Sequence, residues 1–313
     1  MADITHVAVL GAGVIGASWT ALFLAAGRSV AVYDPLPKAE QRVRAYIRMA
    51  WPALDELGLT VRGDPGRVTF HRAAGDAVQG AGFVQENIPE RIDAKHRLIA
   101  QVEGALAPGA IFSSSTSGLT WGAIAKGFRD PSRFILGHPF NPPHLIPLVE
   151  LTAAGPATQD AAITAAQAFY KDIGKVTIRL HKGMPGHVAN RLQAAVWREA
   201  IHLVMQGVAT VEDVDKAMWA GPGLRWAAMG PTMLFHLGAG EGGLRAFCDH
   251  FRDTFNGWWD GMGDPHLDDD VIVRLVQGVQ AAAGATSPAA LSTKRDAMIV
   301  AIQKAVQGHR ANR

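Results

Sequence analysis

A histidine and a glutamate are the residues of this 313-residue sequence with the clearest chemical potential. His138 lies in the run FILGHPFNPP at 134–143, and Glu150 follows twelve residues later in PLVEL at 147–151. Histidine titrates near neutral pH, so it can take the proton of a substrate hydroxyl as a general base. A carboxylate behind its ring would fix the tautomer and stabilise the imidazolium. The two residues together indicate an acid/base pair.

Two further polar residues are candidates to bind a reacting oxygen. Ser117 lies in SSSTSGLT at 113–120, and Asn141 lies three residues after His138. Hydroxyl and amide groups of this kind stabilise charge that develops on an oxygen. Each residue also has a plainer interpretation, because a histidine before proline is common in turns and the serine run could be a polar loop. Glu150 could equally end a strand in solvent, but the grouping favours a catalytic site.

A glycine motif near the start of the chain predicts where a dinucleotide would bind. Residues 7–16 read VAVLGAGVIG, an apolar strand that runs directly into G-x-G-x-x-G. The first glycine makes the tight turn, the second lets the backbone approach a pyrophosphate, and the third lets the next helix pack on the strand. The helix then presents free N–H groups and its positive dipole end to the phosphates. The predicted cofactor contacts of this segment are Gly11, Gly13, Val14, Ile15 and Gly16.

An aspartate after the second apolar run predicts which dinucleotide is used. Asp34 follows the run Ser29–Tyr33 and lies 18 residues after Gly16. A carboxylate at this place accepts the ribose hydroxyls of NAD and repels the 2′-phosphate of NADP. Pro35 and Leu36 supply no cation that would offset this repulsion. We therefore predict NAD as the cofactor; the alternative is a glycine-rich turn beside an ordinary surface aspartate.

The elements that must position these residues alternate between strands and helices in the first part of the chain. Apolar, β-branched-rich runs predict buried strands of a parallel sheet, and amphipathic stretches between them predict helices. This alternation is typical of a Rossmann-type, doubly wound α/β sheet with helices on both faces. The predicted strands are Thr5–Leu10, Ser29–Tyr33, Val68–His71, Gly82–Gln85, Ala110–Ser113, Arg133–Leu136, Pro147–Leu151 and Lys175–Leu180. The predicted helices between them are Gly16–Ala26, Lys38–Leu57, Ile92–Ala107 and Gln159–Ile173.

The predicted strands bring the candidate residues to one edge of the sheet. Ser117 and His138 both come just past the carboxyl ends of apolar strands, which is where ligands bind in open α/β sheets. NAD accepts a hydride, and the oxidation of an alcohol also needs a base for the hydroxyl proton. The glycine motif and His138 therefore fit one reaction, the oxidation of an alcohol.

The pattern changes near Gly183–Gly186, after which long helix-periodic runs follow. We predict an NAD-binding domain at 1–183 and an all-helical domain at 184–313. The polar segment Gly257–Leu267 is predicted as a loop. The predicted helices are Val188–Gln206, Val211–Trp219, Pro231–Leu237, Gly242–Phe255, Asp268–Ala283 and Ser287–Val306.

Composition argues against several other classes of protein. Lys and Arg total 30 against 28 Asp and Glu, with no basic tract, so nucleic acid is not an expected partner. The single cysteine, Cys248, excludes an intrachain disulfide and fits a reducing compartment. There is no signal-peptide pattern and no long apolar run, so we expect a cytoplasmic protein without a membrane span. No residues have metal-ligand spacing, so no metal is expected.

Several motifs together resemble one enzyme family over nearly the whole chain. They are GAGVIG, ENIPE at 86–90, SSTS, GHPFNP, LVE and PGHVANRL at 185–192, in matching order and spacing. By these motifs the sequence resembles the 3-hydroxyacyl-CoA dehydrogenase superfamily. The resemblance implies an NAD-dependent oxidoreductase whose helical C-terminal domain forms a homodimer.

The same resemblance implies roles for individual residues. His138 would be the acid/base and Glu150 its partner, while Ser117 and Asn190 would bind the substrate and orient the reacting oxygen. Besides the glycine motif and Asp34, the cofactor contacts that it implies are Glu90, Lys95, Ser117 and Asn141.

The C-terminal half resembles the short, stand-alone branch of this superfamily, which acts on free hydroxy acids. That branch includes carnitine 3-dehydrogenases and L-gulonate 3-dehydrogenases, the relatives of lambda-crystallin. The runs GLRWAAMG at 223–230 and EGGLR at 241–245 favour the carnitine type. The resemblance therefore implies oxidation of a 3-hydroxyl group to a 3-keto acid without coenzyme A.

A substrate like carnitine needs one site for a quaternary ammonium and another for a carboxylate. Tryptophan faces attract such a cation, and Trp197 and Trp226 are the candidates. Arg225 is placed to bind a carboxylate through two parallel hydrogen bonds. The alternatives are that these tryptophans form a core or a dimer interface, and that Arg225 makes a surface ion pair.

The sequence leaves other substrates open. A sugar acid such as gulonate would need polar partners, for which His202, His236 and Glu241 are available. The segment 257–267, GWWDGMGDPHL, departs from the carnitine-type pattern, so another short 3-hydroxy acid or betaine is a third possibility. A coenzyme A ester would need cations near its 3′-phosphate, and the candidates by composition are Arg62, Arg67 and Arg72.

A protein that binds NAD without useful catalysis, as a crystallin does, is the alternative from a different class. A non-catalytic relative could lose any of the catalytic residues. The set of Ser117, His138, Glu150 and Asn190 is complete here, which favours an active enzyme.

Overall fold

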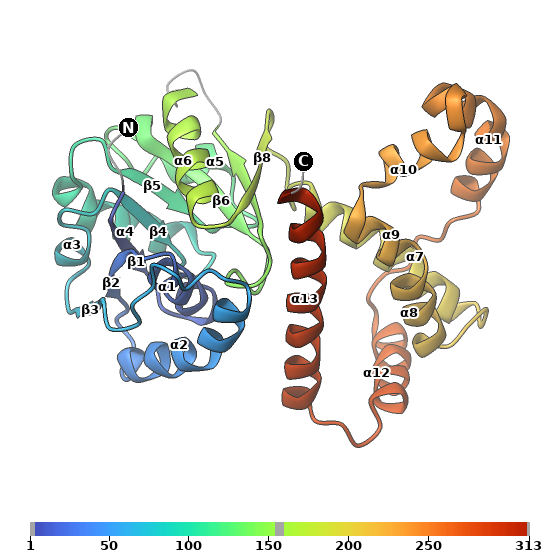
Figure 1. Ribbon diagram of the computed structural model, residues 1–313, viewed down its shortest axis with the longest axis horizontal. Coiled ribbons are helices and arrows are strands. Elements are labelled where there is room, and N and C mark those ends of the chain that lie inside the picture. The colour runs from blue at the N-terminus through green and yellow to red at the C-terminus, as the bar shows by residue number, and fades with distance from the viewer. Residues whose placement is uncertain (1–3, 154–159, 312–313) are drawn as a thin grey trace. The chain divides into compact units, whose positions relative to one another are not determined.

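The computed structural model describes residues 4–153 and 160–311. The chain forms two compact units, Met1–Val188 and Ala189–Arg313 (Figure 1). The first unit is built on a sheet flanked by helices and the second consists of helices, which confirms the predicted fold class. Gln159, the predicted start of one helix, lies outside the described residues.

An eight-stranded sheet forms the centre of the first unit. Its order is β3-β2-β1-β4-β5-β6-β7-β8, and every neighbouring pair is parallel except β6 and β7. The strand order reverses between β1 and β4, so the loops after these two strands face the crevice in which such sheets bind ligands. The strands are β1 (His6–Leu10), β2 (Ser29–Tyr33), β3 (Val68–His71), β4 (Phe83–Glu86), β5 (Ile111–Ser114), β6 (Phe134–Pro139), β7 (Leu148–Thr152) and β8 (Val176–Leu180).

Helices cover both faces of the sheet. They are α1 (Val14–Ala25), α2 (Ala39–Glu56), α3 (Ala74–Ala77), α4 (Ile92–Val102), α5 (Trp121–Ala125) and α6 (Asp160–Asp172), with 3-10 turns η1 (Glu103–Ala105) and η2 (Pro131–Arg133). Successive strand residues point to opposite faces, so each strand contributes to two cores. In β1, Val7 and Val9 pack with α1, α2 and α6, whereas Ala8 and Leu10 pack with α3, α4 and α5.

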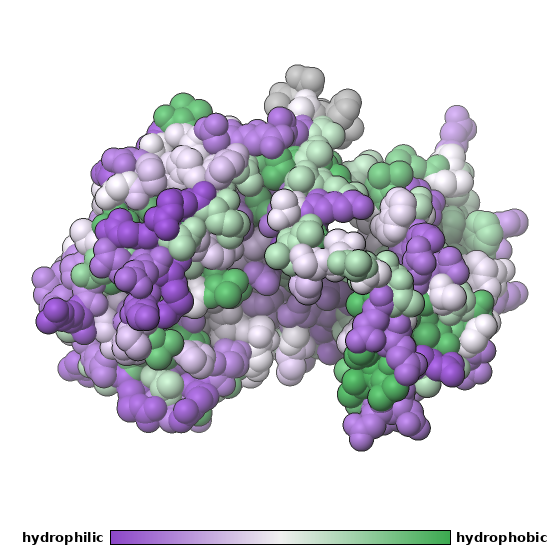
Figure 2. All heavy atoms as spheres, turned by 90° about the horizontal axis from the view of Figure 1, so that it is seen from below, coloured by the Kyte–Doolittle hydropathy of each residue, from purple (hydrophilic) through white to green (hydrophobic). Residues whose placement is uncertain are grey.

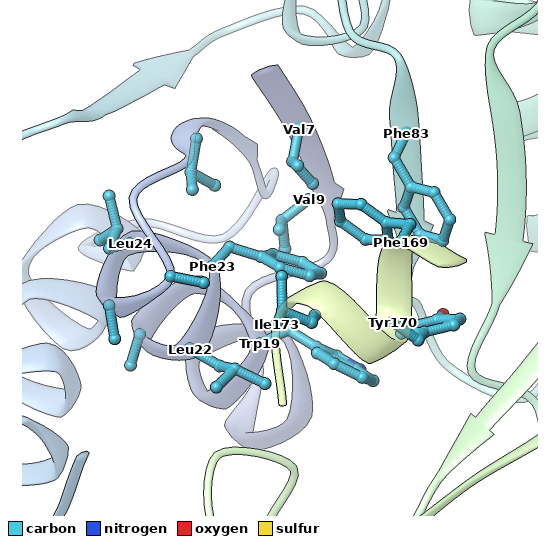
Figure 3. Close-up of a cluster of buried hydrophobic side chains, with 14 of the residues drawn as sticks. Val7, Val9, Trp19, Leu22, Phe23, Leu24, Phe83, Phe169, Tyr170 and Ile173 are labelled. Atoms are coloured by element: carbon cyan, nitrogen blue, oxygen red, sulfur yellow. The ribbon is translucent and has the colours of Figure 1, made fainter. Parts of the chain in front are cut away.

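Aromatic rings fill the core between α1, α6 and the sheet (Figure 3). Trp19 stacks on Phe23 with ring centroids 5.2 Å apart, and Phe83 stacks on Phe169 at 4.2 Å. Burying large rings is strongly favourable, and stacked pairs add to that gain. This packing fixes α1, and with it the glycine motif, against the strands.

Some elements differ from the prediction. Helices α3 and α5 have four and five residues, too few to show a helical period in the sequence. Helix α4 ends at Val102 and η1 follows, so the helix predicted to Ala107 was too long. The strand β6 continues to Pro139, so His138 lies within the strand rather than past its end.

The second unit contains seven helices and one 3-10 turn among its described residues. The prediction missed α9 and ended α11 too early. Helix α11 continues through Gly257, and the ring of Phe255 lies 5.1 Å from Trp258 and 5.7 Å from Trp259, a pairing that stabilises the last turns. The elements are α7 (Ala189–Met205), α8 (Val211–Ala220), α9 (Pro222–Ala228), α10 (Pro231–Gly238), η3 (Gly240–Gly242), α11 (Gly243–Asp260), α12 (Asp269–Ala283) and α13 (Pro288–Ala311).

Residues 4–153 and 160–311 contain neither a helix that could span a membrane nor a cluster of metal-binding side chains. In these ranges every helix is too short or too polar to span a bilayer. The same ranges contain no group of three or more His, Cys, Asp and Glu side chains that could hold a metal ion.

Candidate functional site

The glycine motif lies where β1 and β4 meet at the sheet edge. Gly11 has a φ of +87°, and a Cβ there would lie 2.9 Å from the backbone of Asn87, which follows β4. A Cβ on Gly16 would lie 1.9 Å from the carbonyl oxygen of Gly11. A Cβ on Gly13, by contrast, would meet nothing within 4 Å. The first and third glycines are therefore required by packing, whereas the second leaves exposed backbone that a ligand can approach.

The first turn of α1 is suited to an anion. Gly13 caps this helix without a side-chain hydrogen bond, and its first turn contains no acidic residue. Gly13 and Val14 are exposed and Ile15 is half-buried. The unsatisfied N–H groups and the positive dipole end of a helix bind phosphates well. The segment therefore fits the pyrophosphate of a dinucleotide.

Asp34 is held beside this loop by two backbone amides. Its Oδ2 accepts the N–H of Ala12 at 2.7 Å, and its Oδ1 accepts the N–H of Leu36 at 2.8 Å. The side chain is half-buried at the end of β2. Each carboxylate oxygen can accept a second hydrogen bond, so the group can still receive ribose hydroxyls.

His138 and Glu150 are paired across two antiparallel strands. They lie directly opposite each other in β6 and β7, and Nδ1 of His138 donates to Oε2 of Glu150 at 3.0 Å. Both side chains are buried, with Glu150 fully so. This bond leaves Nε2 as the unprotonated nitrogen of the neutral ring, and Nε2 has no hydrogen-bond partner among the described residues. Burial lowers the pKa of His138 below its ordinary value, while the bond to Glu150 acts in the opposite direction.

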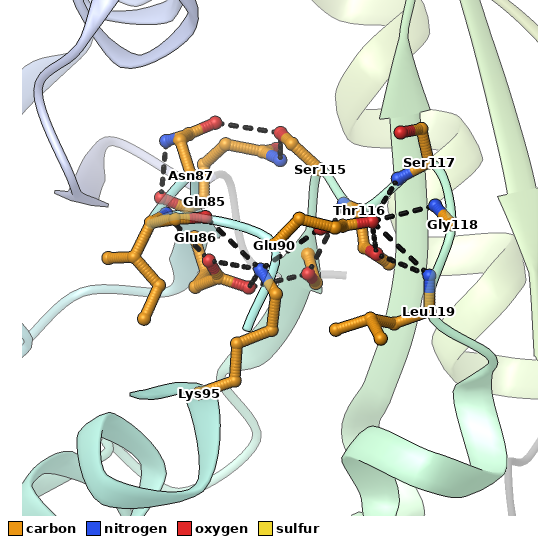
Figure 4. A network of polar contacts seen from close by, with 12 residues as sticks. Gln85, Glu86, Asn87, Glu90, Lys95, Ser115, Thr116, Ser117, Gly118 and Leu119 are labelled. Atoms are coloured by element: carbon orange, nitrogen blue, oxygen red, sulfur yellow. Dashed lines mark hydrogen bonds and ion pairs between the residues drawn. The ribbon is translucent and has the colours of Figure 1, made fainter. Parts of the chain in front are cut away.

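Lys95 lies between two glutamates near the end of β4 (Figure 4). Its Nζ donates to both carboxylate oxygens of Glu86, at 2.7 and 2.8 Å, and lies 3.8 Å from Oε2 of Glu90. Glu86 also accepts the Ser114 hydroxyl and, at 2.7 Å, the Ile88 amide. Lys95 is 1% exposed, and its buried ammonium links the carboxylates of Glu86 and Glu90. Its direct contact with NAD stays a prediction.

Glu90 fastens the loop that carries Ser117 (Figure 4). Its Oε1 accepts the Thr116 hydroxyl and the amides of Ser117, Gly118 and Leu119, the last three at 3.0, 2.6 and 3.2 Å. Burial raises the pKa of Glu90, but these hydrogen bonds and the Lys95 charge outweigh it, so the pKa is lowered overall. The Ser117 hydroxyl is exposed and turned away from this network.

Asn141 lies in the connection from β6 to β7, three residues beyond His138. Its side chain is exposed. Buried Lys175 fixes this connection, because its Nζ donates hydrogen bonds to the carbonyls of Pro143 and Ile146, the latter at 2.8 Å. The backbone that carries Asn141 is thus fixed, and the amide remains available to a ligand.

Comparison with known proteins identifies the family. The family model for the 3-hydroxyacyl-CoA dehydrogenase NAD binding domain matches residues 6–183, and that for the C-terminal domain matches residues 186–265. The chain belongs to the 3-hydroxyacyl-CoA dehydrogenase family. It is an NAD-dependent oxidoreductase, which confirms the predicted enzyme class and cofactor and argues against the non-catalytic alternative.

Individual relatives match nearly the full length of this family member. An L-carnitine dehydrogenase of Streptomyces coelicolor is 44% identical over 303 residues, which cover 97% of this chain and 95% of the relative. An L-carnitine dehydrogenase of Nocardiopsis dassonvillei is 42% identical over 301 residues, or 96% and 91% of the two chains. Among solved structures, an NAD-dependent dismutase, 5-formyl-3-hydroxy-2-methylpyridine 4-carboxylic acid 5-dehydrogenase, is similar with a TM-score of 0.83 at 28% identity, over 98% of this chain and 99% of that one.

The remaining predicted site residues belong to the helical unit of this dehydrogenase. Asn190 is half-buried in the first turn of α7. Trp197 on α7 is 51% exposed and Trp226 on α9 is 38% exposed, and neither ring contacts another aromatic ring of the described chain. Arg225 is exposed beside Trp226. These four residues are therefore accessible within their unit, and their roles stay predictions.

Sequence reasoning missed three polar residues at or near this site. The family resemblance assigns a role to Glu90, the last residue of ENIPE, and none to Glu86, the first. In the structure Glu86 is the direct ion-pair partner of Lys95. Lys175 gave no signal, since a lysine before a strand is ordinarily exposed. His187, in the motif PGHVANRL, is buried with its ring centroid 5.0 Å from that of His138. The only signal for His187 in the sequence is its place three residues before Asn190 in that motif.

Proposed function

We propose that this dehydrogenase oxidises the 3-hydroxyl group of a small free hydroxy acid of the carnitine type to the 3-keto acid. The observation that carries the proposal is the buried pair of His138 and Glu150, in the same unit as a backbone loop that fits a dinucleotide. The L-carnitine dehydrogenases at 44% and 42% identity support the choice of substrate class.

His138 is the proposed acid/base. NAD, when bound, accepts a hydride from the carbon that carries the hydroxyl group. Nε2 of His138 takes the hydroxyl proton, because Nδ1 already donates to Glu150. Glu150 then stabilises the imidazolium and keeps the ring in this tautomer. The Ser117 hydroxyl and the amide of Asn190 are proposed to hydrogen-bond the reacting oxygen and hold it in place.

The proposed cofactor contacts follow the same geometry. Gly11, Gly13, Val14, Ile15 and Gly16 would hold the pyrophosphate, and Asp34 the ribose hydroxyls. Glu90, Lys95, Ser117 and Asn141 would contact the nicotinamide half, with Glu90 and Lys95 also fixing the loop that carries Ser117.

The proposed substrate contacts lie on the helical unit. Trp197 and Trp226 offer exposed indole faces to a quaternary ammonium, and Arg225 offers a guanidinium to a carboxylate. A coenzyme A ester is less well supported. Arg62 pairs with Asp172 at 3.2 Å and Arg67 donates to the carbonyl of Gly27 at 3.2 Å, so these two cations are already engaged.

We expect NADH to form at 340 nm with L-carnitine, and to form much more slowly with L-gulonate, 3-hydroxybutyrate and 3-hydroxybutyryl-CoA. The same assay with NADP in place of NAD tests the role of Asp34, whose charge should keep NADP turnover at least about tenfold lower. Equal turnover with gulonate or the CoA ester would contradict the carnitine-type pocket. Equal turnover with NADP would contradict the assignment of Asp34.

We also propose that the helical unit pairs with a second copy of the chain. Many of its large apolar side chains are exposed, among them Val208 at 68% and Leu224 at 66%, and apolar residues gather on its surface in Figure 2. Its buried large hydrophobic residues, among those described, are Ile201, Val204, Val271 and Val300. A surface of this kind is typical of an obligate interface.

Sedimentation velocity at micromolar concentration is expected to give twice the mass of one chain. Dilution into the nanomolar range should leave the dimer intact, because obligate interfaces bury large apolar areas. A soluble, active monomer under these conditions would contradict this proposal.

A further inference from the structure

His187 is a buried histidine in the turn that precedes α7, and the proposed reaction does not use it. It is 5% exposed, and its φ of 49° places a non-glycine residue in the left-handed region. Side chains with a Cβ seldom adopt this conformation, and where they do, the surrounding structure must hold it. The strain marks His187 as a residue whose position is fixed by its contacts.

One nitrogen of this ring fastens the loop that carries Ser117. Nε2 of His187 donates to the carbonyl oxygen of Thr116 at 3.3 Å. A carbonyl only accepts, so Nε2 carries the hydrogen in this bond. Nδ1 is then the unprotonated nitrogen of a neutral ring, and among the described residues it is buried without a hydrogen-bond partner.

The His187 ring lies beside the His138 ring in a tilted arrangement. The two ring centroids are 5.0 Å apart with an angle of 41° between the planes. The next residue, Val188, contacts the partner of His138, because its N–H donates to Oε1 of Glu150 at 2.9 Å. Two successive residues therefore contact the Ser117 loop, the proposed base and the partner of that base.

We propose that His187 is a positioning residue, which holds the His138 ring against Glu150 and ties the Ser117 loop to that pair. The inference rests on the proposed function of His138 and goes beyond it. It assigns the buried histidine of the turn 185–188 a part in orienting the reaction rather than in binding NAD.

The electrostatic surroundings of His138 make this role measurable. The charged and titratable groups that act on it are Glu150 from β7, Glu90 from the segment after β4, and His187. Burial is the largest cause of the lowered pKa of His138, the two carboxylates raise it, and the His187 imidazole lowers it. A side chain at position 187 that cannot take up a proton and keeps the site buried would remove the repulsion between two protonated rings, and should therefore raise the pKa of His138.

Two variants of the full-length protein separate the contributions of His187. His187→Phe keeps a ring against His138 but cannot donate to Thr116, and His187→Gln keeps a donor near the place of Nε2 but has no ring. We expect His187→Phe to lower kcat about tenfold with an unchanged KM for NAD, because the Ser117 loop loses its hydrogen bond to residue 187 and is positioned less precisely. We expect His187→Gln to keep kcat within about threefold of the unmodified protein, because a donor to Thr116 remains. In both variants the acidic limb of the kcat/KM profile should move to higher pH, because the His187 contribution that lowers the pKa of His138 is removed.

His181→Phe is the matched control, since His181 is exposed and lies outside the site. It should change neither kcat nor the acidic limb.

The inference is overturned if a folded His187→Phe or His187→Gln variant, checked by thermal melting and NADH fluorescence, keeps the acidic limb of the unmodified protein. If His187→Phe does not fold, the limb of His187→Gln decides alone. His138→Gln measured in parallel separates the two proposals: full turnover there would refute the proposed function, whereas an inactive His138→Gln beside unaltered His187 variants would refute this inference only.

Discussion

Replacing His138 by glutamine is expected to lower kcat about a hundredfold to ten-thousandfold while NAD still binds. Glutamine has no basic nitrogen, so the hydroxyl proton would have to leave to water. The glycine motif follows β1 and Asp34 follows β2, so both lie on other elements and should keep their geometry. The measurement is steady-state NADH formation at 340 nm with L-carnitine, together with NADH binding by fluorescence.

The matched control for this prediction is His181→Gln, an exposed histidine of the same unit. It should keep the turnover of the unmodified protein. If His138→Gln also kept it, the base would have to be another group and the proposed mechanism would be wrong.

The role of His138 as a base also predicts how the oxidation rate changes with pH. His138 must be neutral to accept a proton, and burial lowers its pKa below the ordinary histidine value. The oxidation rate should therefore be level at neutral pH and fall only on the acidic side, below about 6.5. The residual activity of His138→Gln should lack this acidic limb, because the titrating group is gone.

The sheet and the cofactor loop could be predicted from sequence because their signals are local. Strands β1 and β2 are short, β-branched apolar runs that can be recognised by themselves. The spacing of the three glycines identifies the motif, and the structure gives Gly11 and Gly16 a steric reason. Helix α5 escaped prediction because it is too short to show a period. Helix α11 continues beyond its predicted end at Phe255 because the Phe255 ring contacts Trp258 and Trp259, and these contacts could not be predicted from residue spacing alone.

The proposed catalytic pair was predictable in kind but not in geometry. The sequence indicated that His138 and Glu150 could work together. Their contact depends on the register of an antiparallel pair, which is set by the connection between β6 and β7 and by the packing of both strands. The contribution of His187 depends on a left-handed turn and a tertiary contact to Thr116, neither of which has a pattern in a single sequence.

Lys95 illustrates the same limit, because its partner is set by the tertiary fold. Lys95 lies nine positions after Glu86 in the sequence, and only the packing of α4 beside β4 brings the ammonium onto that carboxylate. The family resemblance assigns Lys95 to the cofactor, whereas the structure buries it in an ion pair. Because this charge is buried, Lys95 should have a large effect on stability.

Lys95→Met is expected to lower the free energy of unfolding by about 3–5 kcal/mol. Methionine fills a similar volume but leaves the Glu86 carboxylate buried without its cation, and an uncompensated buried charge is costly. The measurement is the shift of the chemical denaturation midpoint, followed by the fluorescence of the tryptophan-containing core. Lys126→Met, at an exposed lysine of the same unit, is the matched control and should change stability by less than about 0.5 kcal/mol.

The double variant Lys95→Met with Glu86→Gln decides whether the loss comes from the stranded charge or from packing. Removing both charges leaves a glutamine whose Oε1 can accept the Ile88 amide and whose NH2 can donate to the Ser114 hydroxyl oxygen, so most of the lost stability should return. A double variant that is less stable than Lys95→Met alone would show that Glu86 stabilises the fold through its other hydrogen bonds. A single variant as stable as Lys126→Met would contradict the ion pair itself, and with it the proposal that Lys95 fixes Glu90 and the Ser117 loop.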